Sequence, residues 1–203
     1  MTISYHKGDL PPGLDFGTSI AIDSETMGLR LQRDRLCVVQ LSAGDGTVHV
    51  VHFPDRDYRA PNLRRVLSDR SITKIFHFAR FDLAMIQRHF DIVCRPAYCT
   101  RTASKLVRTN TERHGLKDLC LELLGVELSK QQQTSDWGAP TLTQQQLDYA
   151  ASDVLYLHRL RDKMDELLSR EGRVQLAQAC FDFLPDRAAL DLAGWEEEDI
   201  FAH

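Results

Sequence analysis

The sequence predicts a single α/β domain in which a mixed β-sheet is flanked by α-helices. Two valine-rich segments of strand length, 36–44 and 47–53, meet at Gly-Asp-Gly, which is typical of an antiparallel hairpin. A further strand at 73–78 runs directly into a helical segment, and from residue 100 onward nearly every segment has its apolar residues at helical spacing. An antiparallel start followed by strand–helix alternation favours a mixed sheet with helices on its faces.

The other elements follow from local signals. The first strand is expected at 19–23, before a turn-like segment, and Pro61 stands where a helix begins. A polar loop is expected over 129–140, and one long helical element over 143–169. The remaining expected helices are 61–69, 79–90, 100–109 and 116–125.

The composition is that of a globular protein. With 203 residues, 43% hydrophobic and 27% charged, the chain fits one domain that folds without disulfides or a structural metal. Its five cysteines stand singly, which favours reduced thiols over a disulfide framework or a zinc site.

The sequence also bounds location and partners. No apolar run approaches the ~20 residues of a membrane span, and the N-terminus lacks the basic-then-apolar order of a signal peptide. We therefore expect a cytoplasmic protein without a membrane partner. The net charge of −4 argues against a surface coated with nucleic-acid-binding residues. It is compatible with an acidic site whose phosphate contacts are confined to a small basic patch.

Two carboxylates end the first expected strand. Alternate residues of a strand point to the same face, so Asp23 and Glu25 share one face while Ile20 and Ile22 share the other. Adjacent carboxylates repel each other, and a cation between them turns that repulsion into attraction. Two unrelated acids at an exposed strand end are the alternative. A third acid, Asp82, lies in the first turn of the next expected helix, where the helix dipole alone would favour it.

Asp153 is harder to explain as a surface residue. A helix places it one turn from Tyr149 and away from the polar stripe formed by Gln145, Asp148, Ser152, Arg159 and Lys163. Its neighbours on that side are mainly apolar and aromatic: Tyr149, Tyr156, Leu157 and Leu160. A carboxylate in such surroundings needs a cation, a proton or strong hydrogen-bond donors. The pattern therefore predicts a functional role for Asp153.

Taken together, four acids from three elements are able to converge on a metal. Ligation by carboxylates alone suits Mg²⁺ or Mn²⁺ better than Zn²⁺. Two such ions can clamp the attacking and leaving oxygens of a phosphodiester.

Three segments carry a resemblance to a known superfamily. AIDSETMGL, HFARFDLAMI and LDYAASDVLYL resemble, in order and spacing, the three exonuclease motifs of the DEDD superfamily. CTRTASKL, HGLKDLCLELLG and KQQQTSDWGAPTLTQQQLDYAA extend the likeness to the ribonuclease D family over most of residues 23–168. Tyr149 holds the position that defines the tyrosine branch, and Asp148 stands where the other branch has histidine. One departure is Gly-Ala-Pro-Thr-Leu after Trp137, where family members often have Arg-Pro-Leu.

The resemblance implies a ribonuclease H-like fold and a 3′→5′ exoribonuclease. Its substrate would be RNA with a free 3′ end, such as a tRNA precursor or another structured RNA, and its products nucleoside 5′-monophosphates. It further implies one exonuclease domain over 1–203, with the motif-bearing core at about 18–168 and a helical extension over 169–203. No additional nucleic-acid-binding domain is expected after it.

The resemblance also assigns roles to the motif residues. Asp23, Glu25, Asp82 and Asp153 would hold two divalent ions, Mg²⁺ or Mn²⁺, and Tyr149 would orient the attacking water. Tyrosine is a poor base because its ordinary pKa is near ~10.

Basic and aromatic side chains near the motifs are the candidate substrate contacts. Arg101, Lys105 and Arg108 line one face of an expected helix, which is either a phosphate track or a solvated face. Aromatic residues near the motifs would stack on terminal bases or belong to the core; they are Phe78, Phe81 and Tyr156. Lys130 is a further candidate cation, and His77, although close to Asp82 in sequence, is interpreted as a packed or strand-end histidine.

Two alternatives remain. A DNA exonuclease of the same superfamily would share the motifs, and the likeness outside them favours RNA. An inactive nucleic-acid-binding module would lack one of the acids or the tyrosine, and all five residues are present. No obligate protein partner is expected.

Overall fold

The computed structural model describes residues 1–129, 131, 132 and 134–202, which form the α/β domain that the sequence predicts. Six strands lie in one sheet in the order β1-β4-β3-β2-β5-β6. They are β1 (Thr2–Lys7), β2 (Ser19–Thr26), β3 (Leu36–Ser42), β4 (Thr47–His52), β5 (Thr73–Phe76) and β6 (Ala97–Cys99).

The predicted antiparallel start and the mixed character of the sheet are confirmed. β3 pairs antiparallel with β2 and with β4, whereas β2 pairs parallel with β5, and β5 parallel with β6. The hairpin turn uses Gly44 and Gly46 at φ 83° and 87°, a conformation that glycine adopts without strain. Every residue of β3 is buried, so β2 is held against the best-packed strand of the sheet.

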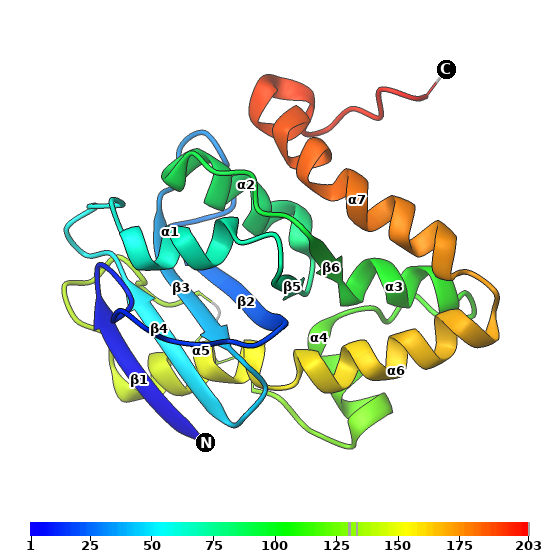
Figure 1. Ribbon diagram of the computed structural model, residues 1–203, viewed down its shortest axis with the longest axis horizontal. Helices are drawn as coiled ribbons and strands as arrows, with labels where there is room; N and C mark the ends of the chain where they lie inside the picture. Colours follow the sequence, from blue (N-terminus) through cyan, green and yellow to red (C-terminus); the bar gives the residue numbers. More distant parts are fainter. Residues whose placement is uncertain (130, 133, 203) are drawn as a thin grey trace.

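Helices cover both faces of this sheet (Figure 1). α1 (Pro61–Ser68) and α2 (Ala79–Phe90) lie on one side, and α5 (Gln144–Leu155) lies on the other, against β2, β3 and β4. The remaining helical elements are α3 (Thr100–Val107), α4 (Leu116–Leu119), the π-helical turn Cys120–Leu124, α6 (Leu157–Arg170), α7 (Val174–Leu190) and the π-helical turn Asp191–Trp195. α7 packs on α2 and β6.

The long helix expected over 143–169 is wrong, because the structure divides it. α5 ends at Leu155 and α6 begins at Leu157, while Tyr156 between them has φ −106° and ψ 0°. α5 packs on the sheet, whereas α6 packs on α3. The helix is divided because its two halves pack against different elements, and no Pro or Gly in the sequence marks the division. The expected polar stripe from Gln145 to Lys163 therefore does not lie on one continuous face.

The sequence gives no signal strong enough to predict β1. Its residues are half-buried or exposed, and it joins the sheet edge by parallel pairing with β4 over Thr2 to Lys7. That stabilisation comes from a partner about forty-five positions away along the chain, which local patterns do not report. All five cysteines are free thiols, as expected, and four of them are buried. None of the helices in the described parts of the chain is long and apolar enough to cross a membrane.

Candidate functional site

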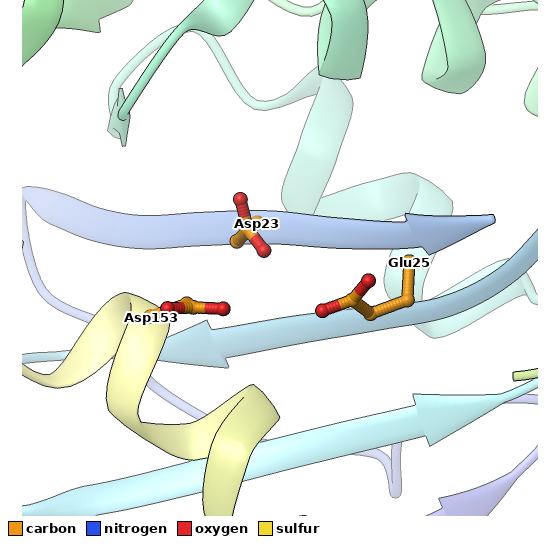
Figure 2. A group of neighbouring side chains, drawn as sticks. All are labelled: Asp23, Glu25 and Asp153. Atoms are coloured by element: carbon orange, nitrogen blue, oxygen red, sulfur yellow. The ribbon is translucent and has the colours of Figure 1, made fainter. Parts of the chain in front are cut away.

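Three of the predicted acids lie together at the centre of the sheet. Figure 2 shows Asp23 and Glu25 on β2 and Asp153 reaching toward them from α5. One carboxylate oxygen from each lies within 4.8 Å of the others. The strand alternation that the sequence predicts brings the first two acids together, and the regular pairing of β2 with β3 is interrupted just after Glu25.

α5 presents Tyr149 and Asp153 to this cluster. The helix begins with a capping box, in which the Thr143 hydroxyl accepts from the Gln146 amide and the Gln146 side chain accepts from the Thr143 amide. Tyr149 and Asp153 are one turn apart on α5, and the charge of Asp153 adds to burial in raising the pKa of the Tyr149 hydroxyl. The buried Trp137 ring packs on the Tyr149 ring with 6.0 Å between centroids. The loop before α5 thus supports the tyrosine from behind.

Asp82 approaches from the opposite side of β2. It lies in the first turn of α2, is 4% exposed, and accepts a hydrogen bond of 2.5 Å from the Ser24 hydroxyl. Ser24 stands between Asp23 and Glu25 on the strand and therefore points to the other face. The structure places Asp82 in the same cavity but not in the cluster of three oxygens.

The acids are close enough to affect one another's ionisation. Burial raises the pKa of Asp23 and of Glu25 well above the usual range, and the neighbouring carboxylates raise both further. Burial also raises the pKa of Asp82 and of Asp153 to about 7. Among the residues that the structure describes, no lysine, arginine or histidine pairs with any of the four. Such a cluster is stable only with protons or with a cation, and all-carboxylate ligation fits Mg²⁺ or Mn²⁺.

The acids line a cavity of about 640 Å³. Its wall includes Tyr149 and also residues that the sequence analysis did not single out as contacts: Met27, Leu29, Lys117 and Trp137. Leu29 is 77% exposed although it is apolar, a signal that only the structure supplies. A second cavity of about 670 Å³ lies elsewhere, and its Lys7 and Arg59 are already paired with Asp55 and Asp57.

The predicted basic face is not one continuous track. Arg101 lines the cavity, and its guanidinium lies 5.3 Å from the centre of the Phe78 ring. Lys105 is exposed and lies outside the cavity lining. Arg108 pairs with Glu122 and donates to the Arg113 carbonyl, so its charge is already engaged.

Two of the three predicted aromatic contacts line the cavity, and the third does not. Phe78 and Phe81 line the cavity; Phe78 is 52% exposed and has φ 67°, and Phe81 packs partly against the core. Tyr156 lies at the junction of α5 and α6 and is not part of the cavity lining. Lys130 lies outside the described residues.

His77 directly follows the last residue of β5, packs against Thr100 and also forms part of the cavity wall. Its Nδ1 lies 2.9 Å from the Thr100 hydroxyl. Burial, assisted by the charge of Arg101, lowers the pKa of His77 to about 3, so the ring is neutral near pH 7.

Comparisons with known proteins agree with this geometry. A family model described as 3′-5′ exonuclease matches residues 13–169. Ribonuclease D from Granulibacter bethesdensis is 31% identical over 155 residues, which are 76% of this chain and 39% of that protein. DNA polymerase I from Aquifex aeolicus is 35% identical over 148 residues, 73% of this chain and 24% of that protein. The chain therefore spans about two fifths or less of the length of these curated relatives.

Two solved structures of similar length have a higher sequence identity to this chain than these relatives do. Brucella melitensis NrnC with bound Mg²⁺ is 56% identical with a TM-score of 0.95, and both chains are covered completely. Brucella melitensis NrnC bound to pGG is 57% identical with a TM-score of 0.96, covering 100% of this chain and 99% of that one. The expected ribonuclease H-like sheet is confirmed by this likeness.

Proposed function

The chain belongs to the 3′-5′ exonuclease family as a ribonuclease D-like member of the DEDD superfamily, and we propose that it degrades short RNAs from a free 3′ end with two divalent ions. The observation that carries the proposal is the carboxylate cluster, which is half-buried, mutually repelling and without a basic partner among the described residues. Folding such a cluster costs free energy that only bound cations or protons offset.

We assign the metal ligands to Asp23, Glu25, Asp82 and Asp153. When bound, two divalent ions supply the positive charge that activates water and stabilises the leaving 3′ oxygen. The closeness of three of these carboxylates supports the assignment, and the contact of Asp82 with Ser24 keeps the fourth acid at the same cavity. Mg²⁺ and Mn²⁺ both suit this donor set.

Tyr149 has a positioning role in this proposal. Burial, and then the charges of Asp153 and Glu25, raise the pKa of Tyr149 above its ordinary value, so the hydroxyl stays protonated at pH 7. It therefore does not remove a proton from water but donates a hydrogen bond and orients its acceptor. The packing of its ring against Trp137 holds it in place for that task.

The choice of short RNA over tRNA precursors rests on the cavity and on one relative. A volume of about 640 Å³ lies in the range of pockets that enclose small ligands. NrnC, which is similar over the whole chain, has been solved with pGG. Arg101 and Phe78, in contact at the rim of the cavity, are our candidates for holding a phosphate and a base. DNA remains the second candidate because the chain is also similar to a DNA polymerase.

We further propose that residues 18–168 carry the activity and that 169–203 support it. Arg80 of α2 forms an ion pair with the buried Asp191 beyond α7, which ties the extension to the helix that carries Asp82. The free cysteines suit the reducing cytoplasm, which we propose as the location.

Substrate length and sugar test this function. Purified protein with Mg²⁺ should hydrolyse a labelled RNA dinucleotide with a higher kcat/KM than an RNA of about twenty nucleotides or the matching DNAs, because the cavity encloses few nucleotides. The measurement is initial rate against concentration for each substrate. Preference for the DNAs would favour the DNA exonuclease, and preference for the long RNA would favour structured-RNA processing.

A further inference from the structure

Gln40 is a polar residue in the most deeply buried strand. β3 is otherwise nearly apolar, and the Gln40 side chain has no exposed surface. It lies directly across from Asp23 in the β2–β3 pairing, so the two side chains share one face of the sheet. The Gln40 Nε2 donates a hydrogen bond of 2.9 Å to Asp23 Oδ2. Gln40 thus touches the cluster from beneath without lining the cavity.

The Gln40 amide is poorly explained as a source of stability. Its nitrogen must face the carboxylate, because an ionised carboxylate only accepts hydrogen bonds. The Gln40 Oε1 is then left buried, and it has no partner within the described part of the chain. An unpaired buried acceptor destabilises the folded state, so an apolar side chain of similar size would fit this strand better.

Holding the Asp23 carboxylate explains the exception. Within the cluster of three acids, Gln40 donates a hydrogen bond to Asp23, and neither Glu25 nor Asp153 has a comparable donor among the described residues. A fixed carboxylate loses less rotational freedom when it binds a cation. We propose that Gln40 is a positioning residue that orients Asp23 for metal binding. This inference rests on the proposed metal site.

The test measures Mn²⁺ binding in the absence of RNA for two variants of Gln40 and one control variant. Gln40→Met keeps the length of the side chain and removes the donor, and Gln40→Asn keeps the amide but shortens its reach. Both should bind Mn²⁺ about 10–100-fold more weakly in calorimetric titration. In turnover assays kcat should fall while KM for RNA stays unchanged. In EDTA, the Tm of Gln40→Met should equal or exceed that of the wild type.

Ser42 provides the matched control. It lies two residues along the same face of β3, is equally buried, and donates its hydrogen bond to the Thr47 carbonyl, away from the acids. Ser42→Ala should lower the Tm and leave Mn²⁺ affinity unchanged. Wild-type affinity in a folded Gln40→Met or Gln40→Asn would overturn the role of Gln40, as would an equal loss of affinity in Ser42→Ala. Failure of the wild type itself to bind Mn²⁺ would overturn the metal site instead. If the Gln40→Met variant does not fold, the amide of Gln40 has a structural role and the inference is also overturned.

Discussion

Replacing Asp153 with asparagine should lower kcat by at least ~10²–10³-fold while the protein stays folded. The change preserves shape and removes one charge from a cluster in which every carboxyl has a raised pKa. Loss of that repulsion should leave the Tm in EDTA unchanged or higher, whereas the site loses a ligand for the cations. Steady-state kinetics on labelled RNA and thermal unfolding measure the two effects on one sample.

Asp148 is the control for this change because it lies on the same helix. It is exposed and accepts a hydrogen bond only from Gln144 among the described residues, and it holds the position that is histidine in the other branch of the superfamily. Asp148→Asn should retain wild-type kcat. An Asp153→Asn protein with wild-type kcat would return Asp153 to a structural role.

The second large effect is that the stabilisation of the folded protein by Mg²⁺ should depend on pH. Asp82 and Asp153 titrate near pH 7 in the folded protein and near pH ~4 when unfolded. Without metal, these raised pKa values contribute stability below pH ~4 that is lost as the pH rises through about 7. Mg²⁺ competes with the protons for the carboxylates. The rise in Tm caused by Mg²⁺ should therefore be larger at pH 8 than at pH 5.

Other groups titrate in the opposite sense, and subtracting the Tm without Mg²⁺ from the Tm with Mg²⁺ removes their contribution. Burial lowers the pKa of His77 in the folded protein. The folded protein therefore loses the stability that this group contributes as the pH falls below ~6.5, the ordinary pKa of histidine. Its contribution is common to samples with and without Mg²⁺ and cancels when the two Tm values are subtracted. A Tm difference that is the same at both pH values would contradict the buried, proton-binding cluster.

The sequence predicted the parts of the fold whose signals are local. Pro61, the Gly-Asp-Gly turn and the alternation around Asp23 each report on a few neighbouring residues, and α1, the β3–β4 hairpin and the acid-bearing β2 are found where they were expected. Asp153 was singled out from its apolar surroundings on a helix that proved too long. The spacing of Tyr149 and Asp153 is unaffected by the division, because both lie within α5, one turn apart, before the break at Tyr156. The functional role of Asp153 stays a prediction.

The remaining features depend on contacts between distant residues. Gln40 faces Asp23 because of the β2–β3 register, and Ser24 meets Asp82 because α2 begins beside β2. Helical spacing placed Arg101 and Arg108 on one face, but Arg108 is paired with Glu122 from the π-helical turn and only Arg101 reaches the cavity. Periodic patterns in the sequence do not predict these contacts between distant residues.

End-labelled RNA tests the central claim most directly. A 5′-labelled RNA with a free 3′ hydroxyl, incubated with the protein and Mg²⁺, should give a descending ladder of products and release nucleoside 5′-monophosphates. The same RNA blocked by a 3′ phosphate should be degraded more slowly, and EDTA should abolish both reactions until Mg²⁺ or Mn²⁺ is restored. Cleavage of a circular RNA, or full activity after exhaustive chelation, would contradict a metal-dependent 3′→5′ exonuclease.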